Sequence, residues 1–217
     1  GGCSMGYYRA GFEVVGVDIN PQKHYPFEFI KTNALSVDVD FMRSFDAIHA
    51  SPPCQGYSAT RTQWNCGKID HPKLITPVRA ALEASEIPWV IENVMGSTLH
   101  WGIVLCGTMF GIKTYRHRVF ESSIMLLQPA HRKHPETIPG RGFGTSPRGY
   151  CNPCGHTSHK GQAQEWGRAL DIDWMNQKEL TQAIPPAYTE FIGRQLIEYL
   201  DAIKGAGLND AHEIMHV

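Results

Sequence analysis

The stretch Phe45–Ser58, with the sequence FDAIHASPPCQGYS, decides the fold and holds the first candidate functional residue. Its first five residues are mostly apolar, which is typical of a buried strand. The adjacent Pro52 and Pro53 fix the backbone and remove two N–H donors, so the chain leaves this strand stiffly. Cys54 therefore follows the carboxyl end of a strand, which is where open α/β sheets keep their active sites.

Strand-like and helix-like patterns alternate on both sides of this stretch. The apolar ranges 12–17 and 88–91 are typical of strands, and 30–34 is a weaker strand. The ranges 4–10 and 73–85 predict helices, the second because its apolar residues recur every three or four positions. Alternation of this kind predicts an α/β fold with a mostly parallel, doubly wound sheet of the Rossmann-like type.

Composition and periodicity divide the chain into four parts. Residues 1–120 form the expected main core, and 121–165 are a Pro-, Gly-, His- and Arg-rich insert with little periodicity. Residues 166–204 supply helices that complete the core, the last of them amphipathic. The end of the chain, 205–217, is expected to be a frayed tail. Because the chain begins within an apparent glycine loop at Gly1, we expect a first strand to precede it.

Overall composition excludes several classes of protein. Apolar residues make up 42% of the 217 residues, enough for the core of one domain. Neither a signal peptide nor a run of about 18 apolar residues is present, so a membrane protein is not expected. The net charge of −1 is not that of a strongly basic nucleic-acid binder. Six irregularly spaced cysteines do not suggest a disulfide framework, and a reactive thiol favours the reducing cytoplasm.

Three groups of side chains suggest covalent chemistry on a polar heterocycle. Cys54 is the nucleophile, because cysteine is the most nucleophilic side chain near neutral pH. Glu92 ends a Val-Ile strand, where burial is expected to raise its pKa into the range of a general acid. Arg116 and Arg118 alternate along an expected strand, so both face one side and His117 faces the other.

Three short motifs carry a resemblance to a known family. Pro53-Cys54-Gln55, Glu92-Asn93-Val94 and Arg116-His117-Arg118 resemble, in order and approximate spacing, motifs of the cytosine-C5 DNA methyltransferases. Gly1–Gly6 is similar to the end of that family's cofactor-binding glycine motif. The resemblance covers most of residues 1–120 and implies a compact bacterial or phage enzyme. Such an enzyme transfers a methyl group from S-adenosylmethionine to C5 of a cytosine flipped out of DNA.

The resemblance also implies a role for each motif residue. Cys54 adds to C6 of the base, and Glu92 hydrogen-bonds or protonates N3. Arg116 and Arg118 hold the base O2 and steady Glu92. Asn93 braces the loop that carries Cys54.

A cofactor site is expected at the ends of the first strands. Asp18 ends a strand and is placed to bind the ribose hydroxyls of a nucleoside cofactor. Family members more often have Glu at this position, Asp at the position of Asn33, and Asn at that of Gln182. The expected cofactor-binding residues are Gly1, Gly2, Asp18, Ile19, Asn33, Ala34, Pro52 and Pro53.

The expected macromolecular partner is double-stranded DNA, bound by a monomer. Gln55 and Ser58 lie beside the nucleophile and are placed to contact the target backbone. Arg132, Lys133 and Arg141 supply positive charge from the insert. The insert is short for reading a long target sequence.

A zinc site is a second expectation for the insert. Cys151, Cys154, His156 and His159 combine a Cys-x-x-Cys spacing with two histidines. Four ligands within nine residues are close together, so His131, His134 or Cys106 are candidates for a second ligand pair. The alternative is a His-rich, DNA-facing loop without metal.

Other functions remain open from sequence. The same chemistry on an RNA cytosine or a free cytosine nucleotide fits the short insert and the near-neutral charge. Transfer of a group other than methyl fits the altered segment around Gln182. A non-catalytic DNA-binding relic is the third alternative, and intact Cys54 and Glu92 argue against it.

Overall fold

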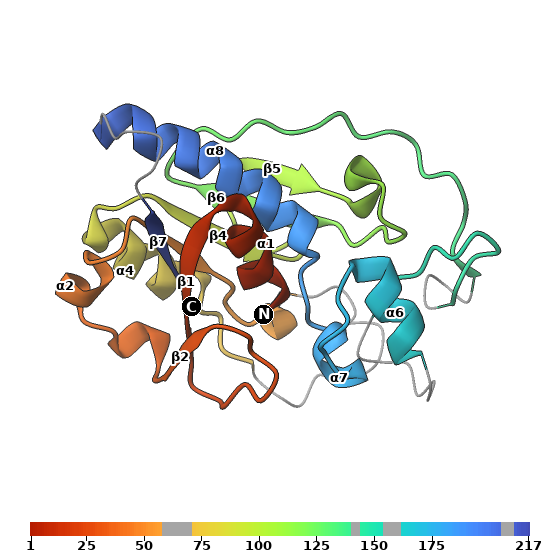
Figure 1. Ribbon diagram of the computed structural model, residues 1–217, viewed down its shortest axis with the longest axis horizontal. Coiled ribbons are helices and arrows are strands. Elements are labelled where there is room, and N and C mark those ends of the chain that lie inside the picture. Colours follow the sequence, from red (N-terminus) through yellow and green to blue (C-terminus); the bar gives the residue numbers. More distant parts are fainter. Residues whose placement is uncertain (58–70, 140–143, 154–161, 205–210) are drawn as a thin grey trace.

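The computed structural model describes residues 1–57, 71–139, 144–153, 162–204 and 211–217, which form a mixed β-sheet with helices on both faces (Figure 1). The seven strands within these residues are β1 (Phe12–Asp18), β2 (Glu28–Lys31), β3 (Ala47–Ala50), β4 (Trp89–Asn93), β5 (Gly102–Leu105), β6 (Arg118–Ser122) and β7 (His212–His216). The helices are α1 (Gly2–Ala10), α2 (Val39–Met42), α4 (Ile75–Ser85), α6 (Ala163–Leu170), α7 (Gln177–Leu180) and α8 (Pro186–Lys204), with 3₁₀ helices η1 (Ala34–Ser36), η2 (Cys54–Gly56) and η3 (Gly107–Phe110).

The strand order is β2-β1-β7-β3-β4-β6-β5. The first five strands of this order are parallel to their neighbours, and β6 runs antiparallel to both β4 and β5. The predicted α/β fold with a mostly parallel sheet is therefore confirmed. Because β1, β7, β3 and β4 point the same way, the residues that follow them gather along one edge of the sheet.

Two apolar layers enclose the sheet. On one face α1 and α8 pack on each other and on residues such as Val90 and Ile214. On the other face α2 and α4 cover the alternate residues, including Ile91 and Met215. Successive side chains of a strand point to opposite faces, so each of these inner strands contributes to both layers. Helices on both sides make the sheet doubly wound, as expected.

The C-terminal segment is a central strand, so the expected frayed tail is wrong. β7 lies between β1 and β3, with Phe12 opposite His212 and Ala47 opposite Ile214. Ile214 and Met215 are fully buried. The segment is short and carries His and Glu beside its apolar residues, so its sequence shows neither a long apolar run nor strict alternation. Pairing with two neighbouring strands and burial on both faces supply the stabilisation that the local pattern does not indicate.

A smaller apolar cluster lies outside the main sheet. Trp166 and Leu170 of α6 pack with Leu180 of α7 and with Cys151. α7 leads into α8, the amphipathic helix that the sequence predicted, and its buried residues are Tyr188, Ile192, Leu196 and Leu200. Among the described residues, no helix combines the length and apolarity needed to cross a membrane.

Candidate active site at the ends of β3 and β4

Cys54 lies directly beyond β3 and is the first residue of η2. Its side chain is half-buried, Pro52 before it is buried, and the thiol lies within electrostatic range of Arg116. The Tyr57 hydroxyl accepts a hydrogen bond from the Ile75 backbone N–H (3.2 Å), which ties this loop to the start of α4. The nucleophile candidate is therefore held on a loop anchored at both ends.

Asn93, the last residue of β4, joins the ends of two adjacent strands. Its side-chain Nδ2 donates a hydrogen bond to the Pro52 carbonyl (2.9 Å), and its Oδ1 accepts one from the Val94 backbone N–H (2.9 Å). Asn93 is fully buried, so a lost partner would leave a polar group desolvated. The contact expected between Asn93 and the Cys54 loop is thus present.

Glu92 and Arg118 form a buried ion pair across β4 and β6. Arg118 Nε lies 2.9 Å from Glu92 Oε1, and only 8% of the glutamate side chain is exposed. Burial raises the pKa of Glu92, while the positive charges of Arg118 and Arg116 and a hydrogen bond with Ser51 act in the opposite direction. The carboxyl group is therefore oriented and has a raised affinity for a proton.

Arg116 is buried and spans two segments far apart in the sequence. Its guanidinium donates to the Pro153 carbonyl (2.6 Å) and to the Thr181 carbonyl (2.6 Å). Burial, with the nearby charge of Arg118, lowers its pKa to about 9. Its Nε has no hydrogen-bond partner within the part of the chain that the structure describes. These contacts make Arg116 a brace for the insert and for the segment before α8, a role that its sequence does not indicate.

A buried hydrogen-bond chain behind Glu92 was not foreseen from the sequence. His49 of β3 contacts the Tyr7 hydroxyl through Nδ1 (2.8 Å) and the Ser51 hydroxyl through Nε2 (3.1 Å). Ser51 in turn hydrogen-bonds Glu92. Burial lowers the pKa of His49 well below its ordinary value, so the ring is neutral. The only signal in the sequence is a histidine within an otherwise apolar strand.

The expected cofactor residues lie at the ends of β1 and β2. Asp18 accepts hydrogen bonds from the Asn20 backbone N–H (2.7 Å) and from Gln22 Nε2 (2.9 Å). Ile19 is 61% exposed. Asn33 caps η1 by accepting from the Leu35 backbone N–H (3.1 Å), and Ala34 is the first residue of that helix.

An open surface recess of about 320 Å³ lies next to these residues. Val17 and Ile30 contribute from β1 and β2, and Phe41 contributes from α2. The other lining residues are Thr32, Val37 and Asp38. A largely apolar recess beside a carboxylate is suited to a flat ring joined to a sugar with free hydroxyl groups.

The glycines expected to approach the cofactor are explained in part by packing. A Cβ on Gly2 would lie 2.3 Å from the Ile184 carbonyl oxygen, closer than atoms can come. A Cβ on Gly1 would lie 3.1 Å from Pro26. Gly2 therefore allows α1 to approach the segment before α8, whatever else binds there.

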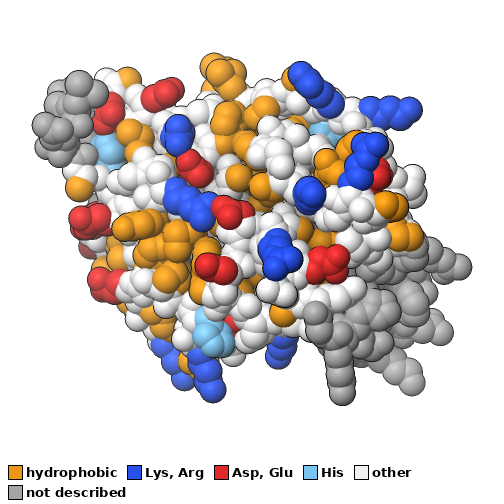
Figure 2. All heavy atoms as spheres, turned by 45° about the vertical axis from the view of Figure 1, so that its right-hand side comes forward, with side chains coloured by type: hydrophobic (Ala, Val, Ile, Leu, Met, Phe, Trp, Pro, Cys, Tyr) orange, Lys and Arg blue, Asp and Glu red, His pale blue; other side chains and the backbone are white. Residues whose placement is uncertain are grey.

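The candidate DNA-contacting residues are exposed where they are described. Gln55 is exposed on η2, and Arg132 and Lys133 are exposed on the connection that follows β6. Ser58 and Arg141 lie outside the described residues. On the face shown in Figure 2, Lys and Arg side chains lie among Asp and Glu at the centre and are more frequent than Asp and Glu at the upper right.

The expected zinc ligands are only partly described. Cys151 is buried with Trp166, its backbone N–H donates to the Lys113 carbonyl (3.0 Å), and burial raises its pKa to about 12. Cys154, His156 and His159 lie outside the described residues. The described metal-ligand groups do not include Cys151. One of them does include Cys106, His131 and His134, which the sequence suggested as candidates for the second half of the site.

Comparison with known proteins adds no assignment: neither a family model nor a curated protein sequence matches this chain.

Proposed function

We propose that this chain is an S-adenosylmethionine-dependent methyltransferase acting on C5 of a flipped cytosine in DNA. The observation that carries the proposal is the junction of β3 and β4. Asn93 holds the Cys54 loop through Pro52, and the adjacent Glu92 is paired with Arg118. A nucleophile and an acid are thus presented from neighbouring strand ends, on the edge of the sheet where α/β enzymes bind substrate.

The order of side-chain steps follows from the chemistry of cytosine. The Cys54 thiolate adds to C6, and the electron pair released toward N3 takes the proton that Glu92 holds. C5 becomes nucleophilic and gains the methyl group, for which S-adenosylmethionine is the electrophilic donor. Water then takes the C5 proton, Cys54 leaves as a thiolate, and N3 returns its proton to Glu92, which restores the aromatic ring.

Glu92 has the environment that its role requires. Burial raises its pKa, which brings a carboxyl group closer to being a useful acid at neutral pH. Arg118 opposes part of this shift and fixes the direction of the carboxyl group, and its own NH1 is held by the His117 carbonyl (2.8 Å). Arg118 is therefore a positioning residue for Glu92.

The residues at the ends of β1 and β2 fit the proposed cofactor. Asp18 would bind the ribose hydroxyls with the lone pairs that its two local hydrogen bonds leave free. Val17, Ile30 and Phe41 would enclose the adenine ring in the neighbouring recess. In doubly wound sheets, ligands bind where the strand order changes direction. Here β1 and β2 lie on one side of β7, and β3 and β4 lie on the other.

The proposed substrate base must leave the helix stack. Cys54 has to reach C6 from one face while the methyl group arrives at C5 from the other, and a stacked base exposes neither face. Gln55 is exposed beside Cys54 and is placed to contact the displaced strand. Arg132 and Lys133 supply positive charge for phosphate contacts from the insert.

Covalent trapping tests this proposal directly. Duplex DNA containing 5-fluorocytosine should form a stable adduct with the enzyme, because fluorine at C5 cannot leave as a proton does. Cys54→Ala should abolish both the adduct and methylation, whereas Cys3→Ala, which changes another cysteine near the same sheet edge, should retain the adduct. Methylation by Cys54→Ala would contradict the mechanism.

Nucleoside mass spectrometry separates the substrate alternatives. The enzyme should produce 5-methylcytosine in duplex DNA, and parallel reactions contain single-stranded RNA and free cytosine nucleotides. Product only in RNA or nucleotides would replace DNA as the substrate while retaining Cys54 chemistry. A different mass added to C5 would identify another transferred group.

A further inference from the structure

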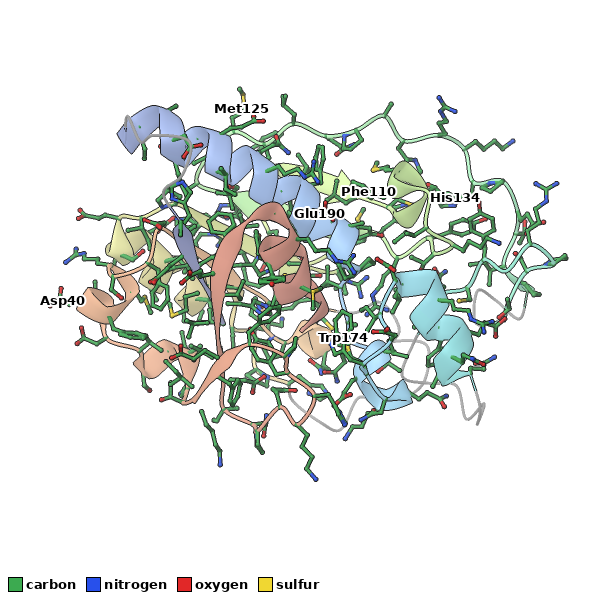
Figure 3. All side chains as sticks on the ribbon, viewed as in Figure 1. Asp40, Phe110, Met125, His134, Trp174 and Glu190 are labelled. Carbon is green, nitrogen blue, oxygen red and sulfur yellow. The ribbon has the colours of Figure 1, made fainter. Side chains whose placement is uncertain are left out.

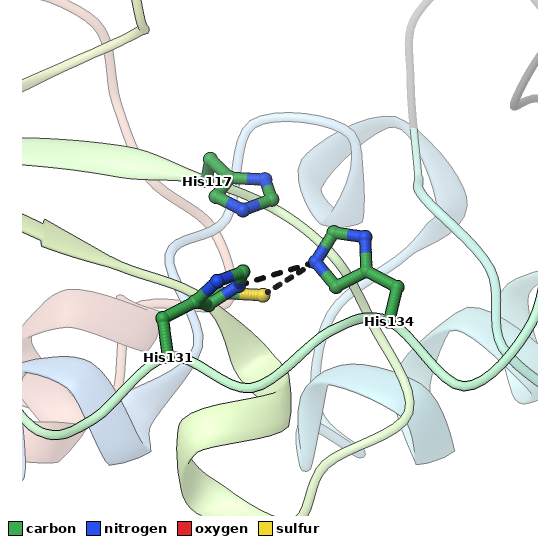
Figure 4. Close-up of side chains that lie close together, drawn as sticks. His117, His131 and His134 are labelled. Carbon is green, nitrogen blue, oxygen red and sulfur yellow. Dashed lines mark hydrogen bonds between the residues drawn. The ribbon is translucent and has the colours of Figure 1, made fainter.

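Four metal-ligating side chains from three separate segments meet beside the arginine pair. Cys106 follows β5 and precedes η3, and His117 lies between Arg116 and Arg118. His131 and His134 come from the long connection after β6. The three imidazoles face one another (Figure 4), and His134 lies beside η3 (Figure 3). The sequence suggested Cys106, His131 and His134 as possible ligands, but no spacing in it brings His117 to them.

Two of the separations between the ligand atoms match the edges of a zinc tetrahedron. His131 Nε2 lies 3.2 Å from His134 Nε2, and Cys106 Sγ lies 3.5 Å from His134 Nε2. Zn–N and Zn–S bonds of ordinary length place two nitrogens about 3.3 Å apart, and a sulfur and a nitrogen about 3.6 Å apart. One atom from each of the four residues lies within 4.8 Å of all the others.

We propose that Cys106, His117, His131 and His134 bind one zinc ion. One thiolate and three imidazoles suit zinc, which prefers sulfur and nitrogen ligands in four-coordinate geometry. Four protein ligands leave no position for substrate, so the ion is structural.

Neighbouring residues hold the candidate ligands in place, as residues around the ligands do in metal sites. The Tyr115 ring stacks on His134 with centroids 4.0 Å apart and planes inclined by 5°. The His117 ring hydrogen-bonds the backbone of Tyr115. Thr108 Oγ1 lies 3.2 Å from Cys106 Sγ, within reach to donate to a thiolate. Each of these contacts restrains one candidate ligand.

A second Cys/His group shows the contrast. Cys3, His49 and His216 also lie within 4.8 Å of one another. Both nitrogens of His49 are hydrogen-bonded, and Nδ1 of His216 contacts the Ser4 hydroxyl (2.8 Å). In that group the ring nitrogens of His49 already have partners outside the group, whereas His134 Nε2 has contacts with two other candidate ligands, His131 and Cys106.

The zinc ion would connect the insert to the catalytic strands. His117 shares its backbone with Arg116 and Arg118, so binding at its ring holds the segment that orients Glu92. His131 and His134 flank Arg132 and Lys133, and binding there holds the connection against β5 and β6. This consequence rests on the proposed function, whereas the metal site itself does not.

Elemental analysis of the full chain tests the site. Protein produced with zinc should carry about one zinc per chain. Cys106→Ser and His131→Gln should each lose most of it, and Cys151→Ser should keep it. Cys151 is the matched control, because it is also a buried cysteine and belongs to the alternative ligand set that the sequence suggested. His131 is exposed, so His131→Gln should remain folded by circular dichroism even where Cys106→Ser does not.

Cobalt substitution identifies the ligands independently of activity. Co(II) in the wild-type protein should show a thiolate-to-metal charge-transfer band, retained in Cys151→Ser and absent in Cys106→Ser. Zinc-free protein that takes up neither metal would overturn the proposal, and so would equal loss of metal in Cys151→Ser. A zinc-loaded protein without methylation would contradict the proposed function and leave the metal site standing.

Discussion

Arg118 Nε lies 2.9 Å from Glu92 Oε1, and the pair joins β4 to β6 inside the protein. A second buried ion pair joins β6 of the same sheet to α4. Arg79 donates to both oxygens of Glu121, from Nε (2.6 Å) and from NH2 (2.7 Å). Glu92 and Glu121 are thus two buried glutamates with arginine partners, and their pKa values are displaced in opposite directions.

The two glutamates should give opposite pH dependences of stability. Burial raises the pKa of Glu92 above 4.5, so the stability from its protonated form is present at low pH and is lost as the pH rises through the raised pKa. Burial also acts to raise the pKa of Glu121, but hydrogen bonds from Arg79 and His100 outweigh it, and the pKa is lowered. The stability that Glu121 contributes is present above pH 4.5 and is lost as the pH falls through its lowered pKa.

Urea unfolding of Glu92→Gln and Glu121→Gln between about pH 4 and pH 8 checks this prediction. The free energy of unfolding of Glu92→Gln should rise relative to wild type with increasing pH, by at most about 1.4 kcal/mol per pH unit. Glu121→Gln should be destabilised above the ordinary glutamate pKa and should approach wild type only at low pH. Parallel curves for the two variants would contradict the opposite shifts.

Asn93→Ala should destabilise the protein and slow catalysis. It leaves the buried Pro52 carbonyl without its donor, at a cost of about 1–3 kcal/mol, and it releases the Cys54 loop. Asn93→Asp should cost more, because a carboxylate would face that carbonyl. Denaturation and kcat measure the two effects, with the exposed Asn20→Ala as the stability control. A wild-type kcat in Asn93→Ala would show that Asn93 does not position Cys54.

Ile214→Ala should show that β7 belongs to the core. Ile214 is fully buried beneath α8, so truncation should cost about 2–5 kcal/mol. Ile203→Ala, at a 56% exposed position of α8, should change stability by only about 0.5 kcal/mol. Thermal or urea unfolding compares them. Equally small losses of stability in the two variants would mean that Ile214 and its strand do not belong to the core.

Asp18→Ala should weaken S-adenosylmethionine binding by about 1.5–3 kcal/mol, the scale of a hydrogen bond to a charged group. Gln22→Ala is the matched control, because it removes a local partner of Asp18 and keeps the carboxylate. Calorimetry should find near-normal affinity in the control. Unchanged affinity in Asp18→Ala would move the cofactor site away from the end of β1.

The parts predictable from sequence are those with a local cause. Apolar periodicity indicated α4 and α8, and the apolar runs before Asp18 and Glu92 indicated β1 and β4. The Pro-Pro pair placed Cys54 beyond a strand end, where the structure has it. The contacts of Arg116 with Pro153 and Thr181 were not predictable, because they join residues 37 and 65 positions away.

The sequence by itself determined the α/β class, the strand ends that carry the candidate chemistry, and the motifs whose resemblance supports the proposed reaction. Each depends on residues within a few positions of one another. Tertiary structure alone decided that the C-terminal segment is an inner strand, β7, and that His117 lies beside Cys106, His131 and His134. Both depend on long-range pairing, whose favourable energy comes from neighbours that a local pattern does not contain.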